Sequence, residues 1–392
     1  MVARRLQQLK HIWRRGVHSA SMDVPGSDAA TLPHGFVFDI DGVLLRGKEV
    51  LPQALRAMSK LYTPDKSSPR MPLAFLTNGG GMTERRKAHQ LEQLLGVNIH
   101  ADQVILSHTP YRSLAAKYTN TPVLIIGRNH SIVEVAKSYG FNKTISSQQI
   151  ARSDPTAFPF WAQKEDWVAG PSADRYVPNL RMGIEDNPIK AIFVMTDPSD
   201  WYIDLQLITD ILIGGGVLGR RMEHVPANTP PIEIFFSNPD LLWANQHPAP
   251  RFGQGAFKAC VETLYEKVTG TPLTENIRTF GKPNPEPYRL VEASLLKQAK
   301  KMDLLPRNFS FSTSSKPPFS AIYAVGDNSA ADIRGANSAG SPWVSMLVKT
   351  GVFPKELDNC PIDPAVFVVD DVEKAVDAAM HHTRSMKWHS MR

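Results

Sequence analysis

The chain has 392 residues, of which 42% are hydrophobic and 21% charged, a composition that is typical of soluble globular proteins and a length that predicts two domains. Its formal net charge is +6, but residues 1–22 carry five basic side chains and no acidic one, so the rest of the chain carries only +1 (six minus five). These numbers argue against a nucleic-acid partner, and no apolar stretch approaches the roughly 20 residues that a transmembrane helix needs.

Residues 1–22 have the composition of a mitochondrial transit peptide, because they are rich in arginine, lack acidic residues and carry serines near their end. At helical spacing the apolar side chains of this segment fall on one face. Those side chains are Val2, Leu6, Leu9, Trp13 and Val17. The segment therefore predicts import into the mitochondrion, with the matrix as the destination.

Short apolar runs alternate with helical patterns in the next part of the chain. The runs at 35–38 and 72–76 predict strands, and the amphipathic segments at 51–62 and 83–95 predict helices. This alternation predicts a parallel sheet covered by helices, with ligands bound at the carboxyl ends of the strands.

A second α/β passage is predicted over residues 113–236, with strands at 123–126, 191–195 and 232–236. Its pattern fails over 146–187, which predicts a long irregular insertion. The first pattern then returns. Segments 34–112 and 237–385 are therefore predicted to form one discontinuous core, in which residues 306–318 are a surface loop.

Two features that suggest other functions are predicted to be structural. Residues 214–219 fit the dinucleotide pattern GxGxxG, but they follow a segment with helical spacing rather than a strand. A turn that ends a helix is therefore expected there. Cys260 and Cys360 have no nearby cysteine partner, which argues against a disulfide framework or a zinc cluster.

Two aspartates, Asp39 and Asp41, follow the first predicted strand. Asp39 should be ionised at neutral pH and could attack phosphorus to form an aspartyl-phosphate. Asp41 could then protonate the leaving oxygen and later deprotonate water. Gly42 would let the backbone turn away and leave room for a phosphate group.

Two further polar segments could bind a phosphoryl group. Thr77, Asn78 and Gly79 follow the second predicted strand and offer a hydroxyl and backbone N–H groups to phosphate oxygens. Lys282 lies between Gly281 and Pro283 and could neutralise charge on both the nucleophile and the phosphoryl group.

A last acidic segment contains Asp327, Asn328 and Asp332, after the predicted strand at 321–325. Carboxylate and carbonyl oxygens are the ligands that Mg²⁺ prefers. The predicted magnesium site takes carboxylates from Asp39 and Asp327 and the backbone carbonyl of Asp41. Asn328 and Asp332 are predicted to support it.

Together and in this order, these four segments resemble the four motifs of the haloacid dehalogenase superfamily, over roughly residues 34–380. The run TNGGG at 77–81 resembles the second motif of subclass IIA, and the inserted passage resembles a C2-type cap. Residues 237–240 and 253–256 are similar to that subclass's segments after the cap. The chain most resembles the cat eye syndrome critical region protein 5 group, including its fungal mitochondrial members.

This resemblance implies an α/β fold, with a Rossmann-like core around a parallel sheet and an inserted α/β cap of the C2 type. It also implies Mg²⁺ as cofactor and hydrolysis of phosphate esters. The implied roles are a nucleophile at Asp39, an acid and base at Asp41, a phosphate-binding hydroxyl at Thr77, the third-motif lysine at Lys282, and the fourth-motif acids at Asp327 and Asp332.

The resulting hypothesis is a phosphatase that acts on a small or lipid-linked phosphate monoester. Phosphoryl transfer to another acceptor, as in a mutase, would use the same nucleophile and stays open. A non-catalytic mitochondrial scaffold associated with phospholipid metabolism is a third hypothesis, although all four motifs are present. The substrate is not predicted, because cap residues that contact leaving groups follow no readable code, and the oligomeric state also stays open.

Overall fold

The computed structural model describes residues 32–128, 131–160, 187–243, 245–247, 249–305 and 316–390. The predicted targeting segment, most of the predicted insertion at 146–187 and most of the predicted loop at 306–318 lie outside these residues. No helix within the described ranges is both long and apolar enough to cross a membrane.

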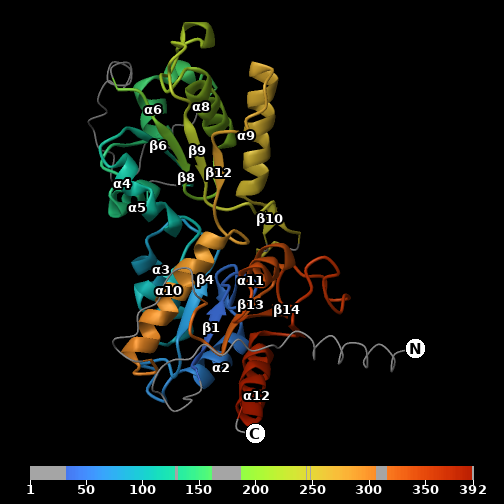
Figure 1. The fold of residues 1–392 in the computed structure, drawn as a ribbon. Helices are drawn as coiled ribbons and strands as arrows, with labels where there is room; N and C mark the ends of the chain where they lie inside the picture. The colour runs from blue at the N-terminus through green and yellow to red at the C-terminus, as the bar shows by residue number, and fades with distance from the viewer. Residues whose placement is uncertain are drawn as a thin grey trace. The chain divides into compact units, whose positions relative to one another are not determined.

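Six parallel strands form the first sheet, in the order β15–β14–β13–β1–β4–β5. The strands are β1 (His34–Phe38), β4 (Leu73–Leu76), β5 (Val104–Ile105), β13 (Ala321–Gly326), β14 (Trp343–Val348) and β15 (Phe367–Val369). Strands from the two ends of the chain thus lie side by side, as their blue and orange-red colours show (Figure 1). The predicted strands at 35–38, 72–76 and 321–325 are confirmed.

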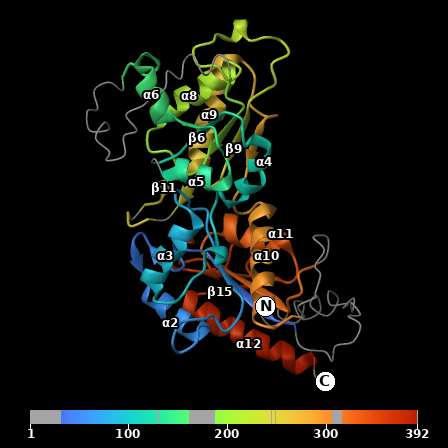
Figure 2. The same cartoon turned by 90° about the vertical axis from the view of Figure 1, so that its left-hand side faces the viewer.

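Helices cover both faces of this sheet (Figures 1 and 2). One face packs against α2 (Pro52–Leu61), α3 (Glu84–Leu95) and α12 (Val372–Ser390), and the other against α10 (Pro285–Lys301) and α11 (Arg334–Ala339). Local sequence sets the bounds of α3. The Thr83 hydroxyl accepts a hydrogen bond from the Arg86 N–H at 3.3 Å, and Gly96 ends the helix with a left-handed φ of 65°.

A second parallel sheet of five strands has the order β12–β9–β8–β6–β7. Its strands are β6 (Val123–Ile126), β7 (Thr144–Ser146), β8 (Ala191–Val194), β9 (Glu233–Phe236) and β12 (Ile277–Thr279). One face packs against α6 (Ser147–Ser153), α8 (Trp201–Ile213) and α9 (Gln254–Thr269), and the other against α4 (Ala115–Tyr118) and α5 (Ser131–Tyr139). Each sheet has buried apolar clusters of its own, which confirms an α/β protein with a second, inserted α/β domain.

The return to the first sheet comes later than predicted. Residue 237 was expected to begin the second part of the core, but β12 pairs with β9, and Phe257 of α9 is buried with Leu207 of α8. An apolar period reveals that a helix has a buried face, but it does not reveal which sheet covers that face. We therefore propose that the inserted domain extends to about residue 280.

The predicted insertion at 146–187 also begins too early, because α6 occupies residues 147–153. The Ser146 hydroxyl accepts a hydrogen bond from the Gln149 N–H at 3.3 Å, and the Gln149 side chain accepts one from the Ser146 N–H at 2.9 Å. This reciprocal pair is a capping box, a start signal that is readable in the sequence.

The remaining elements are short. They are β2 (Leu45–Arg46), β3 (Glu49–Val50), η1 (Ala101–Gln103), η2 (Thr109–Ser113), η3 (Pro155–Ala157), η5 (Met222–His224), β10 (Leu242–Trp243), β11 (Arg251–Phe252) and η6 (Ser329–Ile333). The GxGxxG segment follows α8 and forms the predicted turn, with positive φ at Gly215 and Gly216. Cys260 and Cys360 are both free.

Candidate active site

Neighbouring strands of the first sheet place the predicted site residues at one edge. Asp39 follows β1, Thr77 follows β4 and Asp327 follows β13, and these three strands are adjacent. All nine predicted site residues line one cavity of about 450 Å³. They are Asp39, Asp41, Thr77, Asn78, Gly79, Lys282, Asp327, Asn328 and Asp332.

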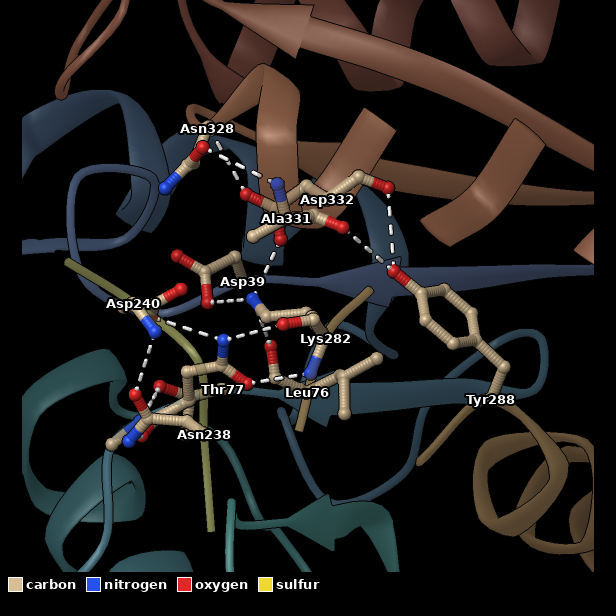
Figure 3. A network of polar contacts seen from close by, with 12 residues as sticks. Asp39, Leu76, Thr77, Asn238, Asp240, Lys282, Tyr288, Asn328, Ala331 and Asp332 are labelled. Carbon is tan, nitrogen blue, oxygen red and sulfur yellow. Dashed lines mark hydrogen bonds and ion pairs between the residues drawn. The ribbon is translucent and has the colours of Figure 1, made fainter. Parts of the chain in front are cut away.

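Lys282 is the central cation of this site. It follows β12 of the second sheet, and its Nζ lies 2.6 Å from both Asp39 Oδ1 and Asp332 Oδ1. Nζ also donates a hydrogen bond to the Leu76 carbonyl at 3.1 Å. Figure 3 shows the Lys282 side chain directed between the two carboxylates. The segment that follows β12 of the second sheet thus supplies a side chain to the site at the edge of the first sheet.

Asn78 holds the Lys282 backbone from both sides. The Asn78 Oδ1 accepts a hydrogen bond from the Lys282 N–H at 2.8 Å, and Nδ2 donates to the Lys282 carbonyl at 3.0 Å. Nδ2 also donates to Asp240 Oδ2 at 3.0 Å. The Asn78 side chain therefore positions the lysine, whereas the predicted phosphate contacts of this segment use its hydroxyl and backbone N–H groups.

Three buried carboxylates gather around the single ammonium of Lys282. Oxygen atoms of Asp39, Asp327 and Asp332 lie within 4.8 Å of one another. Burial raises the pKa of Asp39 well above its usual value, and Lys282 opposes this rise. Burial, with the charge of Asp332, raises the pKa of Asp327 to about 7. When ionised, these three carboxylates carry more negative charge than the one ammonium balances, and their hard oxygen donors suit a divalent cation.

The backbone closes tightly around Asp327. The Val352 N–H donates a hydrogen bond to Asp327 Oδ2 at 2.7 Å. A Cβ atom would lie 2.5 Å from that oxygen at Gly42 and 1.7 Å from it at Gly351, so both positions need glycine. Gly42 was predicted to leave room for phosphate, whereas the structure gives it this contact. Gly351 and Val352 were not predicted, because neither carries a polar side chain and only their backbone approaches Asp327.

Asp41, the predicted acid and base, lines the same cavity as Asp39. Burial raises the pKa of its carboxyl, which favours a protonated form. Three nearby cations oppose that rise: Lys87, Lys282 and Arg128. The Thr77 hydroxyl, also in the cavity, accepts a hydrogen bond from the Gly79 N–H at 2.9 Å.

Several cavity residues lie outside the predicted motifs. Asp240 was noted only as part of a resemblance, yet burial raises its pKa to about 6 and its carboxylate contacts Asn78. Lys87, Arg128 and Asp197 also line the cavity and were not predicted. Arg128 and Asp197 form an ion pair at 3.3 Å. No local pattern marks these three residues, since their place depends on how distant segments meet.

Comparison with known proteins assigns the family. The sequence matches the family described as haloacid dehalogenase-like hydrolase over residues 36–142, and the one described as HAD-hydrolase-like over residues 279–375. A mitochondrial hydrolase of Saccharomyces cerevisiae is 37% identical over 350 residues, which are 87% of this chain and 94% of the yeast protein. The chain therefore belongs to the haloacid dehalogenase-like hydrolases, a family of enzymes.

Further relatives place it within that family. A cardiolipin synthase (CMP-forming)/mitochondrial hydrolase fusion protein of Schizosaccharomyces pombe is 36% identical over 348 residues, which are 88% of this chain and 53% of the fusion protein. A solved Pyrococcus horikoshii protein has a TM-score of 0.55 at 19% identity, with 88% of this chain and 99% of that one covered. A p-nitrophenyl phosphatase from Archaeoglobus fulgidus has a TM-score of 0.51 at 15% identity, with 88% and 99% covered. The shared fold is an α/β core with a parallel sheet and an inserted cap domain.

Proposed function

We propose that this hydrolase is a magnesium-dependent phosphatase that cleaves a small or lipid-linked phosphate monoester through an aspartyl-phosphate intermediate. The observation that carries this proposal is the geometry around Asp39, a buried carboxylate whose Oδ1 lies 2.6 Å from the Lys282 ammonium. Structural neighbours named p-nitrophenyl phosphatase and glycerol phosphate phosphatase have the same fold, which supports the reaction class.

Two steps of chemistry use this chain's own residues. Asp39 attacks phosphorus, a bond forms from its carboxylate oxygen to phosphorus, and the bond to the leaving oxygen breaks while Asp41 donates a proton to that oxygen. Asp41 then removes a proton from water, which attacks phosphorus and restores Asp39. Thr77 and Lys282 hold the phosphoryl oxygens and balance their charge.

The metal fits the excess of carboxylates beside Lys282. We propose that the Asp39 and Asp327 carboxylates and the Asp41 backbone carbonyl hold Mg²⁺, with Asp332 and Asn328 as supports. When bound, Mg²⁺ would neutralise charge on the nucleophile and on the phosphoryl group. Asp332 contacts Lys282 at 2.6 Å, which supports a role in orienting the lysine.

A mitochondrial location belongs to the same proposal. The Saccharomyces cerevisiae relative is named a mitochondrial hydrolase, and residues 1–22 have the composition of a transit peptide. Residues 1–30 fused to a fluorescent reporter should direct it to mitochondria. A reporter that stays in the cytosol or is secreted would argue against import.

The function is tested with the purified full chain and a panel of phosphate monoesters, assayed with Mg²⁺ and with EDTA. We expect orthophosphate release that depends on Mg²⁺ and on Asp39. Product analysis with and without an added alcohol acceptor separates hydrolysis from phosphoryl transfer. Mg²⁺-dependent binding of orthophosphate without turnover of any ester would favour a non-catalytic scaffold instead.

A further inference from the structure

Two lysines line the active-site cavity without belonging to any of the four motifs. Lys48 lies in the turn between β2 and β3, and Lys87 lies in the first turns of α3. Both line the same cavity of about 450 Å³ as Asp39 and Asp41. The proposed reaction steps do not use either lysine.

Lys87 is a partly buried cation that lacks a carboxylate partner. Its Nζ donates a hydrogen bond to the neutral Gln90 side chain at 3.1 Å, and no carboxylate among the described residues forms an ion pair with it. Burial lowers its pKa, so its charge is held there at a cost in free energy. The cation Arg128 differs, because Asp197 pairs with it at 3.3 Å inside the same cavity.

The position of Lys87 relative to Asp41 indicates which part of a substrate it would meet. As the proposed proton donor, Asp41 must contact the bridging oxygen, so the space beyond it belongs to the leaving group. Lys87 and Asp41 line the same cavity, and the charge of Lys87 lowers the pKa of the Asp41 carboxyl. Lys282 instead pairs with Asp39 at 2.6 Å, so Lys87 is left for an anion that the leaving group brings into the cavity.

We propose that Lys87, assisted by Lys48, forms a second anion subsite that selects phosphate monoesters whose leaving group carries a negative charge of its own. That charge is a carboxylate or a second phosphate, since both offer the oxygen acceptors that an ammonium binds. The inference rests on the proposed phosphatase function and narrows its substrate class.

Binding of matched phosphonates tests the subsite without turnover. Propylphosphonate and 3-phosphonopropionate have the same chain length and differ in a terminal methyl or carboxylate, and propane-1,3-bisphosphonate offers a second phosphoryl group. With the full chain and Mg²⁺, calorimetry should give a Kd about ten- to hundredfold lower for an anionic tail than for the neutral one, the effect of one charge-assisted hydrogen bond. The phosphonate that binds more tightly shows whether the subsite prefers a carboxylate or a second phosphate on the leaving group.

Variants of one helix provide the controls. Lys87→Met should reduce the preference at least tenfold, and Lys87→Arg should keep most of it. Arg85→Met removes an equal charge from an exposed position on α3 outside the cavity and should leave the preference unchanged. Added salt should weaken the preference.

Two results would overturn the subsite: equal Kd values for the neutral and both anionic phosphonates, or a preference that Lys87→Met leaves intact. Neither result would count against the proposed phosphatase function, because both concern binding and not turnover. Failure of the proposed function looks different, because the phosphonates would then bind while no phosphate ester is turned over.

Discussion

Two buried polar clusters in this chain, one around Glu84 and one around Lys282, differ in how completely their carboxylates are paired. Glu84, at the start of α3, accepts hydrogen bonds from the Thr109 hydroxyl at 2.7 Å and the Tyr139 hydroxyl at 2.6 Å. Its second oxygen accepts from Arg112 at 2.7 Å. One carboxylate thus meets three donors, whereas at the active site Asp39, Asp327 and Asp332 cluster and the Lys282 ammonium pairs with only Asp39 and Asp332. The first arrangement is complete within the chain, and the second leaves charge for a ligand to balance.

The Glu84 cluster also supports the active site around Lys282. His108 lies with Nδ1 2.8 Å from the Tyr139 hydroxyl, and its Nε2 accepts a hydrogen bond from the Gly81 N–H at 3.3 Å. Burial lowers the pKa of His108 to about 4, so the ring is neutral at physiological pH and Nε2 can accept. Gly81 belongs to the loop between β4 and α3, which lines the cavity at Gly79 and Met82. The Glu84 cluster therefore positions the loop that carries the proposed phosphate-binding groups.

The largest expected effect comes from the nucleophile. Asp39→Asn should reduce turnover at least ~10⁴-fold, because an amide does not attack phosphorus. The same change removes one of three clustered carboxylates, so the metal-free protein should not lose stability. Steady-state rates and thermal unfolding with EDTA check the two parts. An active Asp39→Asn enzyme would contradict the assignment.

Asp41→Asn should have the next largest effect. The substitution leaves the backbone carbonyl of residue 41 in place, but the side-chain amide cannot transfer a proton. The rate should therefore fall ~10²–10⁴-fold. The loss should be smaller for 4-nitrophenyl phosphate, whose leaving group needs little protonation. Rates on an alkyl phosphate and on this ester are compared, with Mg²⁺ affinity as the control. Wild-type rates on both esters would show that Asp41 is not the acid and base.

The sequence predicts the parts of the site that sit at strand ends. Asp39 and Asp327 follow buried apolar runs, and parallel strands bring their carboxyl ends to one edge. Lys282 was predicted from its motif, although the strand before it joins the second sheet rather than the first. Local pattern is sufficient for these residues.

The other half of the cavity depends on tertiary contacts that no local pattern contains. Lys87 resembles any solvent-facing lysine of an amphipathic helix, and Arg128 follows a strand of the inserted domain. Both line the cavity only because the two parts of the chain meet there. The same reason explains why the sheet that contains β12 was misassigned.

A smaller effect, on stability, is expected when the Glu84 cluster is disrupted. Glu84→Gln should lower the free energy of unfolding by about 2–4 kcal/mol, since an amide cannot accept hydrogen bonds from the two buried hydroxyls and also pair with the Arg112 guanidinium. Glu134→Gln, at an exposed ion pair with Arg86, is the matched control and should change stability by less than about 0.5 kcal/mol. Urea unfolding measures both. Equal stability of the two variants would show that the Glu84 cluster contributes no more than a surface pair.

The smallest effect should be the pH dependence of stability that the Lys282 cluster causes. The pKa of Asp327 is raised by burial and by Asp332 from 3.8 to about 7, so the folded protein holds this proton more tightly than the unfolded chain does. That contribution to stability is complete below pH 4 and is lost as the pH rises through 7. Between pH 5.5 and 7.5 it should remove about 2 kcal/mol from the metal-free protein.

The proposed Mg²⁺ would bind the ionised carboxylates, so its stabilising effect should grow over the same pH range. Thermal unfolding with EDTA and with Mg²⁺ at both pH values measures this difference. Asp327→Asn serves as the reference, because subtracting its profile removes the contribution of the titrating groups that do not interact with Asp327. If the variant shows the same pH dependence and the same Mg²⁺ effect as the wild type, Asp327 neither has a raised pKa in the folded protein nor binds the metal. The contrast between the two clusters would then need another cause.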